Sequence, residues 1–451
     1  MGAEQLVRAL GPWRRPDATL IAALDQAVRD AVLDGRIRTG SELPAERRLA
    51  AALGVSRGTV TAALDRLRDS GWVATRHGSA STVRLPPAAA ERIAPISATG
   101  ESGAVTDLRR AVPAAPQEAY LAAARRALDR AAPLLAEHGE PGPGLPELRA
   151  SIAGRYTREG LATRPEQILV TSGARAALTL LAVHFEPRVA AVESPTYFDA
   201  LHVLRGSGTR LAGVRVTAEG WDLDQLEAAF TAARGQLAYL VPDFQNPTGA
   251  LMPLRTRRAV AELAERHRVT VIADETMRDL DLRDRPEPLP RIRGAVLIGS
   301  TSKAIWSGLR IGWIRAATPL IRRLQGHPLA GPLSVPPVQQ LIAVELLDDL
   351  EPVLERRRGE LRRRRDHLSA LLGNDTRWDF TVPPGGLALW LRLAEVSADT
   401  VVERAGRNGV ELTSGPRFAA DATLTRHLRV PYTPPSNVLD RVAAVLDAAA
   451  C

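Results

Sequence analysis

Five short apolar segments alternate with helical patterns in the central part of this 451-residue chain. The apolar segments have the length of strands and lie at 168–171, 189–192, 237–241, 269–273 and 295–298. Helical patterns occupy 174–184, 222–234 and 253–267. Such alternation is typical of βαβ units, so we expect an α/β fold whose doubly wound, mostly parallel sheet carries helices on both faces.

Polar residues follow the C-terminal end of each predicted strand. These clusters are Ser172-Gly173, Glu193-Ser194-Pro195-Thr196-Tyr197, Asn246-Pro247-Thr248-Gly249, Asp274-Glu275 and Ser300-Thr301-Ser302-Lys303. In open α/β sheets, ligands bind in the crevice outside this edge. Five polar clusters at one edge therefore predict a ligand site there.

Lys303 is the only lysine in the chain, and the other 58 of the 59 Lys and Arg residues are arginines. Unlike a guanidinium, a primary amine loses its proton when it is desolvated and then condenses with a carbonyl group to form a Schiff base. The alternative is a surface lysine without a special role. The hydroxyls of Ser300 and Ser302 and the guanidinium of Arg310, all close in sequence, would suit a phosphate. An amine beside a phosphate site suggests pyridoxal 5′-phosphate as the cofactor.

The other clusters suit the remaining parts of this cofactor. The segment Ser172-Gly173-Ala174-Arg175 opens a helix after a strand, where free backbone N–H groups bind phosphates, although Gly-rich helix starts are common. Asp274 can pair with a pyridinium nitrogen, or it can accept a structural hydrogen bond instead. Asn246 can donate to the phenolate oxygen of the ring or simply belong to an Asn-Pro turn. Tyr197 can stack on the ring or only pack.

The N-terminal part of the chain predicts three helices and a hairpin. Helices are expected at 19–33, 45–53 and 56–70, and strands at 72–74 and 81–85. The short turn at 53–55 is typical of a helix-turn-helix, and Ser56 is a suitable N-cap for the third helix. The outward residues of that helix, which can contact DNA phosphates and base edges, are Arg57, Thr59, Thr61 and Arg68. Three helices with outward arginines can also be a solvated cap.

Composition limits the class of protein. A length of 451 residues favours two or three domains, and 45% apolar with 24% charged residues is ordinary for a globular protein. The single cysteine, Cys451, argues against disulfides and a cysteine-rich metal site, which fits a cytoplasmic location. No apolar run approaches the roughly 20 residues that span a bilayer, so we expect no membrane partner. Residues 1–85 hold 13 arginines against 9 acids, half of the net charge of +8, which favours a polyanionic partner at this end.

A Pro-, Ala-, Ser- and Gly-rich stretch at 86–105 predicts a linker. It would separate a DNA-binding domain at 1–85 from a cofactor-binding large domain at 106–330. A small domain would follow at 331–451.

Residues 19–85 resemble the winged helix of the GntR group of bacterial repressors. The resemblance rests on Gly35-x-Ile37, Gly40-x-x-Leu43-Pro44-x-x-Arg47-x-Leu49-Ala50 and Leu53-Gly54-Val55-Ser56-Arg57-x-Thr59-Val60. It implies that Arg47 and Arg57 bind phosphates, that Thr59 lies at the groove, and that a wing with His77-Gly78 enters the minor groove. The residues predicted to contact a double-stranded DNA operator are Arg47, Ser56, Arg57, Thr59, Thr61, His77 and Gly78.

Residues from about 107 to 451 resemble fold-type I aminotransferases. The matching motifs are Gly142-x-Gly144-Leu145-Pro146-x-Leu148-Arg149, Pro165-Glu166-Gln167-Ile168, Asn246-Pro247-Thr248-Gly249, Ser302-Lys303 with Gly308-Leu309-Arg310-x-Gly312, and Pro384-Gly385-Gly386. The resemblance implies an internal aldimine on Lys303, with Asp274 at the ring nitrogen, Asn246 at the phenolate and Tyr197 stacked on the ring. The implied phosphate ligands are Ser300, Ser302, Arg310 and the amides of Ala174 and Arg175. Arg429 would bind a substrate carboxylate.

Two departures from that family argue against efficient turnover. The chain lacks the tyrosine that commonly follows the cofactor-binding aspartate, since it reads Asp274-Glu275-Thr276-Met277. His138 stands where many members of the family have a tyrosine.

A winged helix, a linker and an aminotransferase-like body together resemble the MocR type of GntR regulator. The resemblance implies a homodimer in which an amino acid or amine displaces Lys303 from the cofactor, as an external aldimine, and changes DNA affinity by closing the small domain. Three alternatives stay open: a working aminotransferase with an incidental head, a body that serves only for dimerisation, and a repressor that binds no cofactor.

Overall fold

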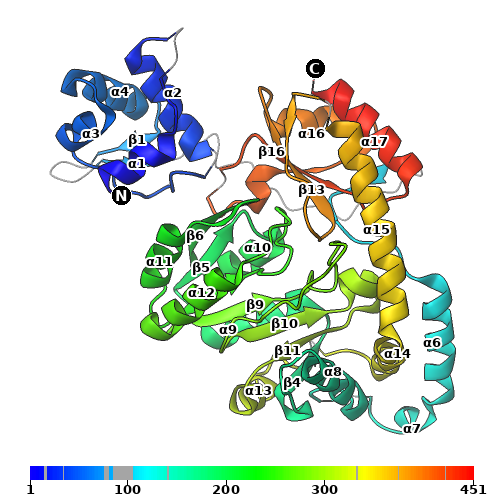
Figure 1. Ribbon diagram of the computed structural model, residues 1–451. Helices are drawn as coiled ribbons and strands as arrows, with labels where there is room; N and C mark the ends of the chain where they lie inside the picture. The colour runs from blue at the N-terminus through cyan, green and yellow to red at the C-terminus, as the bar shows by residue number, and fades with distance from the viewer. Residues whose placement is uncertain are drawn as a thin grey trace.

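The computed structural model describes residues 1–14, 18–33, 35–75, 81–84, 105–139, 142–331, 334–373, 375–421 and 423–450. The N-terminal residues form a small helical unit beside the body of the molecule (blue in Figure 1), which we call the head. Its elements are α1 (Ala3–Leu10), α2 (Leu20–Leu33), α3 (Glu46–Leu53), α4 (Arg57–Asp69), β1 (Val73–Ala74) and β2 (Thr82–Val83). One apolar cluster joins the helices, with Leu24, Leu49 and Val60 buried in it. The sequence pattern does not predict α1, whose Leu6 and Leu10 complete this cluster.

The helix-turn-helix forms where the sequence predicts it. Gly54 ends α3 with a left-handed φ of 64°, a conformation that glycine adopts without strain. Ser56 caps α4, because its Oγ accepts a hydrogen bond from the Thr59 N–H at 3.1 Å. β1 and β2 pair antiparallel, as expected for the base of a wing. The predicted wing residues His77 and Gly78 lie outside the described residues.

An eight-stranded sheet forms the centre of the body, in the order β4-β11-β10-β9-β8-β5-β6-β7. Its strands are β4 (Ile168–Thr171), β5 (Val189–Ser194), β6 (Arg210–Thr217), β7 (Gly220–Trp221), β8 (Leu237–Leu240), β9 (Thr270–Asp274), β10 (Val296–Ser300) and β11 (Gly312–Arg315). The five predicted strands are β4, β5, β8, β9 and β10. The pairs from β10 through β9, β8 and β5 to β6 are parallel, whereas β11 and β7 run antiparallel to their neighbours. The sheet is therefore mostly parallel, as predicted.

Apolar clusters lie on both faces of this sheet, because successive strand residues point to opposite faces. In β4, Ile168 and Val170 belong to one cluster and Leu169 to the other. The first cluster includes residues of α6 (Gln117–Asp129), α8 (Pro146–Arg158), α11 (Leu223–Ala232), α12 (Leu254–His267) and α14 (Pro337–Asp348). The second includes residues of α9 (Ala174–Phe185), α10 (Phe198–Gly206) and α13 (Thr318–Gln325). Shorter elements are α7 (Ala132–Leu135), η1 (Pro165–Gln167), η2 (Ser302–Trp306) and η3 (Ser307–Leu309).

The long helix α15 (Leu350–Leu372) leads from these layers to a smaller α+β unit (gold to red in Figure 1). That unit contains β12 (Trp378–Asp379), β13 (Ala388–Leu393), α16 (Ala398–Arg407), β14 (Val410–Glu411), β15 (Thr413–Ser414), η4 (Gly415–Phe418), β16 (His427–Pro431) and α17 (Ser436–Ala449). Its sheet has the order β12-β13-β16-β15, and β14 pairs separately with β3 (Thr106–Asp107). This architecture confirms the predicted fold class. No described helix is long and apolar enough to cross a bilayer.

Candidate functional site

Lys303 lies in η2, a π-helical turn that begins shortly after the end of β10. Its Nζ donates a hydrogen bond to the backbone oxygen of Ala111 at 2.8 Å. Burial, and after it the positive charge of Arg429, lowers the pKa of the Lys303 amine to about 8, against the opposite effect of Asp274. With such a pKa, roughly one amine in ten is neutral at pH 7. This side chain can therefore act as a nucleophile near neutral pH.

Asp274 is the last residue of β9, and its carboxylate is buried. Its Oδ2 accepts a hydrogen bond from the Tyr239 hydroxyl at 2.7 Å, and its Oδ1 accepts one from the Thr276 N–H at 2.9 Å. Burial raises the pKa of Asp274, and among the described residues no arginine, histidine or lysine forms a salt bridge with it. The neighbouring Glu275 pairs instead with Arg291, at 2.7 Å. A buried carboxylate without an ion pair suits a cationic group of a ligand.

The start of α9 lies beside the ends of β11 and β10. Gly312 of β11 pairs with Thr171 on one side and with Ser300 on the other. A Cβ atom at Gly312 would lie 2.4 Å from the carbonyl carbon of Gly173, so this close approach requires glycine. No side chain of a described residue caps α9, so its first backbone N–H groups are available to an anion. This arrangement brings together Ser172, Gly173, Ala174, Ser300 and Ser302. The hydroxyl oxygens of Ser300 and Ser302 are 2.8 Å apart.

Arg310, whose guanidinium is predicted to bind the phosphate, is exposed, and so is Arg175, whose backbone amide is predicted to bind it. Arg310 forms no ion pair with a described residue and has a left-handed φ of 55°. Arg175 has its Nη1 3.7 Å from Asp199 Oδ1. Asp199 also accepts a hydrogen bond from the Tyr197 hydroxyl at 2.7 Å, which holds the predicted stacking residue against the start of α10.

Arg429 of β16 is almost completely buried, with 2% of its surface exposed. Its Nη1 lies 3.4 Å from Asn246 Oδ1, and its Nη2 donates to the Arg109 backbone oxygen at 2.6 Å. Its Nε has no hydrogen-bond partner among the described residues. Burial lowers the pKa of Arg429 to about 10. A buried guanidinium without a carboxylate partner suits an anionic ligand group, and its contact with Asn246 joins two of the predicted site residues.

Glu193, the penultimate residue of β5, links two loops of the site. Its carboxylate is fully buried and accepts hydrogen bonds from Trp221 Nε1 at 2.8 Å, Val241 N at 3.0 Å and Gln245 Nε2 at 3.1 Å. Burial raises the pKa of Glu193 to about 8, and these donors oppose that rise. Gln245 also donates to the Pro195 oxygen at 2.7 Å. Glu193 therefore connects the loop before Tyr197 to the loop before Asn246, a role that the sequence pattern does not reveal.

The described residues of the head that are predicted to contact DNA differ in their exposure and in their bonding within the head. Arg47 and Arg57 are exposed on α3 and at the start of α4, where a phosphate could reach them. The hydroxyls of Ser56 and Thr59 lie 2.8 Å apart at the cap of α4. The Thr61 hydroxyl donates to Glu46 Oε2 at 2.7 Å, so it ties α4 to α3 within the head.

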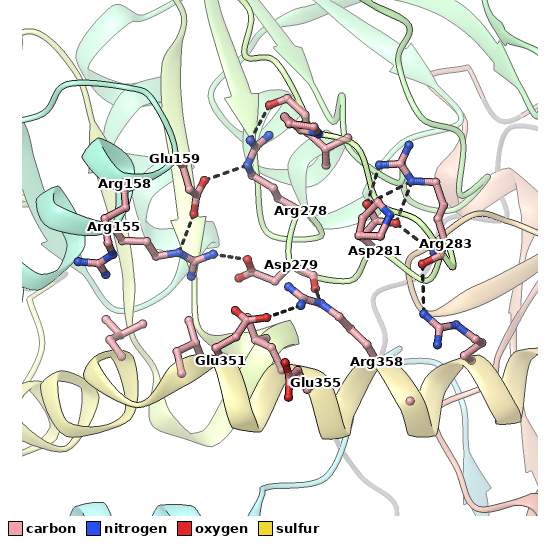
Figure 2. A pocket seen from close by; sticks show the side chains of 18 of the residues that line it. Arg155, Arg158, Glu159, Arg278, Asp279, Asp281, Arg283, Glu351, Glu355 and Arg358 are labelled. Carbon is pink, nitrogen blue, oxygen red and sulfur yellow. Dashed lines mark hydrogen bonds and ion pairs between the residues drawn. The ribbon is translucent and has the colours of Figure 1, made fainter.

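A wide cleft of about 980 Å³ opens between α8, the segment after β9 and α15, as Figure 2 shows. Most of its arginines have carboxylate partners: Arg155 lies 3.0 Å from Glu159, Arg283 2.7 Å from Asp281, and Arg358 2.7 Å from Glu351. None of the predicted site residues lines this cleft. These paired charges largely compensate one another, whereas Asp274 and Arg429 form no ion pair with a described residue.

Comparisons with known proteins relate two parts of the chain to known families. Residues 109–446 match the family of class I and II aminotransferases, and residues 20–83 match the gntR family of bacterial regulatory proteins. The chain is 31% identical over 411 residues to the HTH-type pyridoxine biosynthesis transcriptional regulator PdxR of Corynebacterium glutamicum, covering 87% of each chain. It is 29% identical over 335 residues to the probable rhizopine catabolism regulatory protein MocR of Rhizobium meliloti, covering 67% of this chain and 66% of that one.

A similar solved structure is that of LysN, the α-aminoadipate aminotransferase of Thermus thermophilus. It was determined with N-(5′-phosphopyridoxyl)-L-leucine bound. The two structures superpose with a TM-score of 0.71 at 28% identity, covering 77% of this chain and 92% of LysN.

Proposed function

Because the chain belongs to the MocR type of GntR regulators, in which a DNA-binding head precedes a class I and II aminotransferase domain, we propose that it senses an amino compound through pyridoxal phosphate at Lys303. The observation that carries this proposal is the placement of the only lysine. Two buried charges shift the pKa of its amine, which is lowered to about 8: the carboxylate of Asp274 and the guanidinium of Arg429. Neither group forms an ion pair with another described residue.

The groups of the site that lack partners match the parts of pyridoxal phosphate. Asp274 would hold the ring nitrogen in its protonated form, and Asn246 would donate a hydrogen bond to the phenolate. The uncapped start of α9, with Ser300 and Ser302 beside it, would bind the phosphate. The bound cofactor supplies an aldehyde with which primary amines condense, and Lys303 is the one side chain of this protein with such an amine.

An effector amine would compete with the Lys303 amine for that aldehyde. The carboxylate of an amino acid would meanwhile bind Arg429, whose guanidinium forms charge-assisted hydrogen bonds with carboxylates. These two contacts favour an amino acid over a simple amine. Pairing of two copies would present two heads to the half-sites of a DNA operator. Binding to chromosomal DNA would require the regulator to be in the cytoplasm.

A contact between the head and the small unit offers a route by which ligand binding could reach the DNA. The Thr39 hydroxyl donates to Asp421 Oδ2 at 2.9 Å, and Asp421 lies between η4 and β16. In the same segment, the ring centroid of Phe418 lies 4.8 Å from the guanidinium carbon of Arg429. An anion at Arg429 would thus act on the segment that contacts the head. Ligand binding would change DNA affinity if the protein bound the ligand with different affinities in two arrangements of the head.

The test compares operator binding with catalytic turnover. A duplex selected by the protein from random DNA would serve as the operator probe, and the loaded protein would be titrated with amino acids. We expect one class of amino acid to change both the visible absorption and the operator affinity, without sustained release of a keto acid. Sustained keto-acid production from an amino donor and a keto acceptor would instead favour a working aminotransferase, the alternative that the similarity to LysN supports.

A matched variant separates sensing from signalling. Asp421→Ala removes the carboxylate that accepts the hydrogen bond from Thr39, while it leaves Lys303 and Arg429 in place. The variant should keep the spectral response to the amino acid and lose most of the change in operator affinity. An unchanged operator response would contradict the proposed route.

A further inference from the structure

A second guanidinium, that of Arg417, packs against an aromatic ring that Arg429 also contacts. Arg417 belongs to η4, directly before Phe418. Its guanidinium carbon lies 5.9 Å from the ring centroid of Phe198, and the guanidinium carbon of Arg429 lies at the same distance from that ring. The two cations therefore share one aromatic neighbour at the start of α10, the helix that follows Tyr197.

Arg417 has no anionic partner within the described residues. Its Nε is buried without a hydrogen bond, and no ion pair is formed by its outer nitrogens. The carboxylate that acts on it through space, Asp199, already accepts a hydrogen bond from Tyr197 and lies 3.7 Å from Arg175. Burial lowers the pKa of Arg417. A partly desolvated guanidinium without a counter-ion is costly unless a ligand supplies one.

The charges around this position are mainly positive. Arg110 lowers the pKa of Lys303, and Arg109 lowers that of Arg417. The carboxylate of Asp107 already forms an ion pair with Arg109, whose Nη2 lies 2.9 Å from its Oδ2. A ligand with a single carboxylate would compensate Arg429 and leave Arg417 without a counter-ion. A ligand with two anionic groups would compensate both.

We propose that Arg417 binds a second anionic group of the effector, so that the site selects amino acids with an acidic side chain over the corresponding amides. This inference rests on the proposed function, because it assigns the α-carboxylate to Arg429. A guanidinium binds a carboxylate through two parallel N–H···O bonds, whereas a neutral amide offers one acceptor and no charge. Arg417 also lies four residues before Asp421, so the second contact would attach the ligand directly to the segment that touches the head.

The experiment titrates the cofactor-loaded, full-length protein with L-glutamate and L-glutamine, which differ by one charge at nearly equal volume. L-aspartate and L-asparagine test a shorter spacing. Binding is followed by the visible absorption of the cofactor and, separately, by operator affinity. We expect the acid of one pair to bind about tenfold to a hundredfold more tightly than its amide.

Variants assign that preference to the side chain. Arg417→Gln should bind the acid and the amide with similar affinity, and Arg417→Lys should retain part of the preference because it keeps the charge. Arg407→Gln, which removes an exposed arginine paired with Glu403 on α16, is the matched control and should keep the full preference. An unchanged response of Arg417→Gln to the amide would show that this variant is folded and loaded.

The outcomes separate this inference from the function on which it rests. Equal affinities of the wild type for acid and amide, or a preference that survives Arg417→Gln, would overturn the role of Arg417 and leave amino-acid sensing intact. A wild type whose spectrum responds to no amino acid would overturn the proposed function and the role of Arg417 together.

Discussion

Tyr239→Phe removes a hydrogen bond that stabilises the buried carboxylate of Asp274. The Tyr239 hydroxyl donates at 2.7 Å and the Thr276 N–H at 2.9 Å, so the variant loses the first bond and keeps the hydrogen bonding from Thr276. A hydrogen bond to a charged group contributes about 1.5–3 kcal/mol. Because that hydrogen bond favours the charged carboxylate, its loss should raise the pKa of Asp274 further, beyond the rise that burial already causes.

The consequence is weaker binding of pyridoxal phosphate. The free protein can relieve the loss by protonating Asp274, whereas a protein that holds a protonated ring nitrogen cannot. The dissociation constant of the cofactor should therefore increase near pH 7.5, by up to about a hundredfold, which corresponds to the full free energy of the lost hydrogen bond. The defect should grow as the pH falls, because protons then compete with the ring nitrogen for the carboxylate. Titration of the free protein with pyridoxal phosphate, followed by visible absorption, measures both effects.

A second buried tyrosine provides the control. The Tyr432 hydroxyl donates to the backbone oxygen of Gly385 at 3.2 Å, so Tyr432→Phe removes a buried hydroxyl that faces a neutral acceptor. This control should bind the cofactor as the wild type does. If Tyr239→Phe also binds it with wild-type affinity, Asp274 does not hold the ring nitrogen, and our interpretation of the site is refuted.

Three further predictions concern the same fold. Gly312→Ala places a methyl group within 2.4 Å of the backbone at the start of α9, so cofactor affinity measured by absorption should fall at least tenfold; wild-type affinity would show that this approach is not needed. Cofactor loading at Lys303, timed by stopped-flow absorption, should accelerate as the pH rises through about 8, because only the neutral amine reacts; a rate independent of pH would contradict this. Arg257→Met removes one of the cations of Asp243, which is fully buried 2.6 Å away, so the free energy of unfolding measured in urea should fall by about 3–5 kcal/mol. Arg266→Met, which breaks an exposed ion pair, should lower it by less than about 1 kcal/mol.

The strands that end at the site could be predicted because each is an apolar run closed by polar residues. β11 could not be predicted, since Gly312–Arg315 begins with a glycine and offers only two apolar residues between that glycine and an arginine. Its antiparallel insertion between β4 and β10 nevertheless builds the close approach at Gly312. β6 was not predicted, although its sequence contains the pattern of a strand: the residues that are buried alternate along Arg210–Thr217, as in a strand with one buried face.

Among the site residues, Lys303 could be found because its residue type is unique in the chain. The partnership of Tyr239 with Asp274 could not be found, since it depends on the register that places Tyr239 opposite Ile272, two residues before the aspartate. Arg417 is one of 58 arginines, and only its missing partner distinguishes it. In the head, helical periodicity predicts that Thr61 points outward, but it cannot show that Glu46 of α3 accepts a hydrogen bond from the Thr61 hydroxyl.

Borohydride reduction of the cofactor-loaded protein, followed by peptide mass mapping, tests the central claim most directly. Lys303→Ala has no side-chain amine left, so its only primary amine is the N-terminus. We predict one phosphopyridoxyl group on the wild-type peptide that contains Lys303 and none on the corresponding peptide of the variant. A wild-type peptide without the adduct, while the cofactor is retained elsewhere or not at all, would contradict the account.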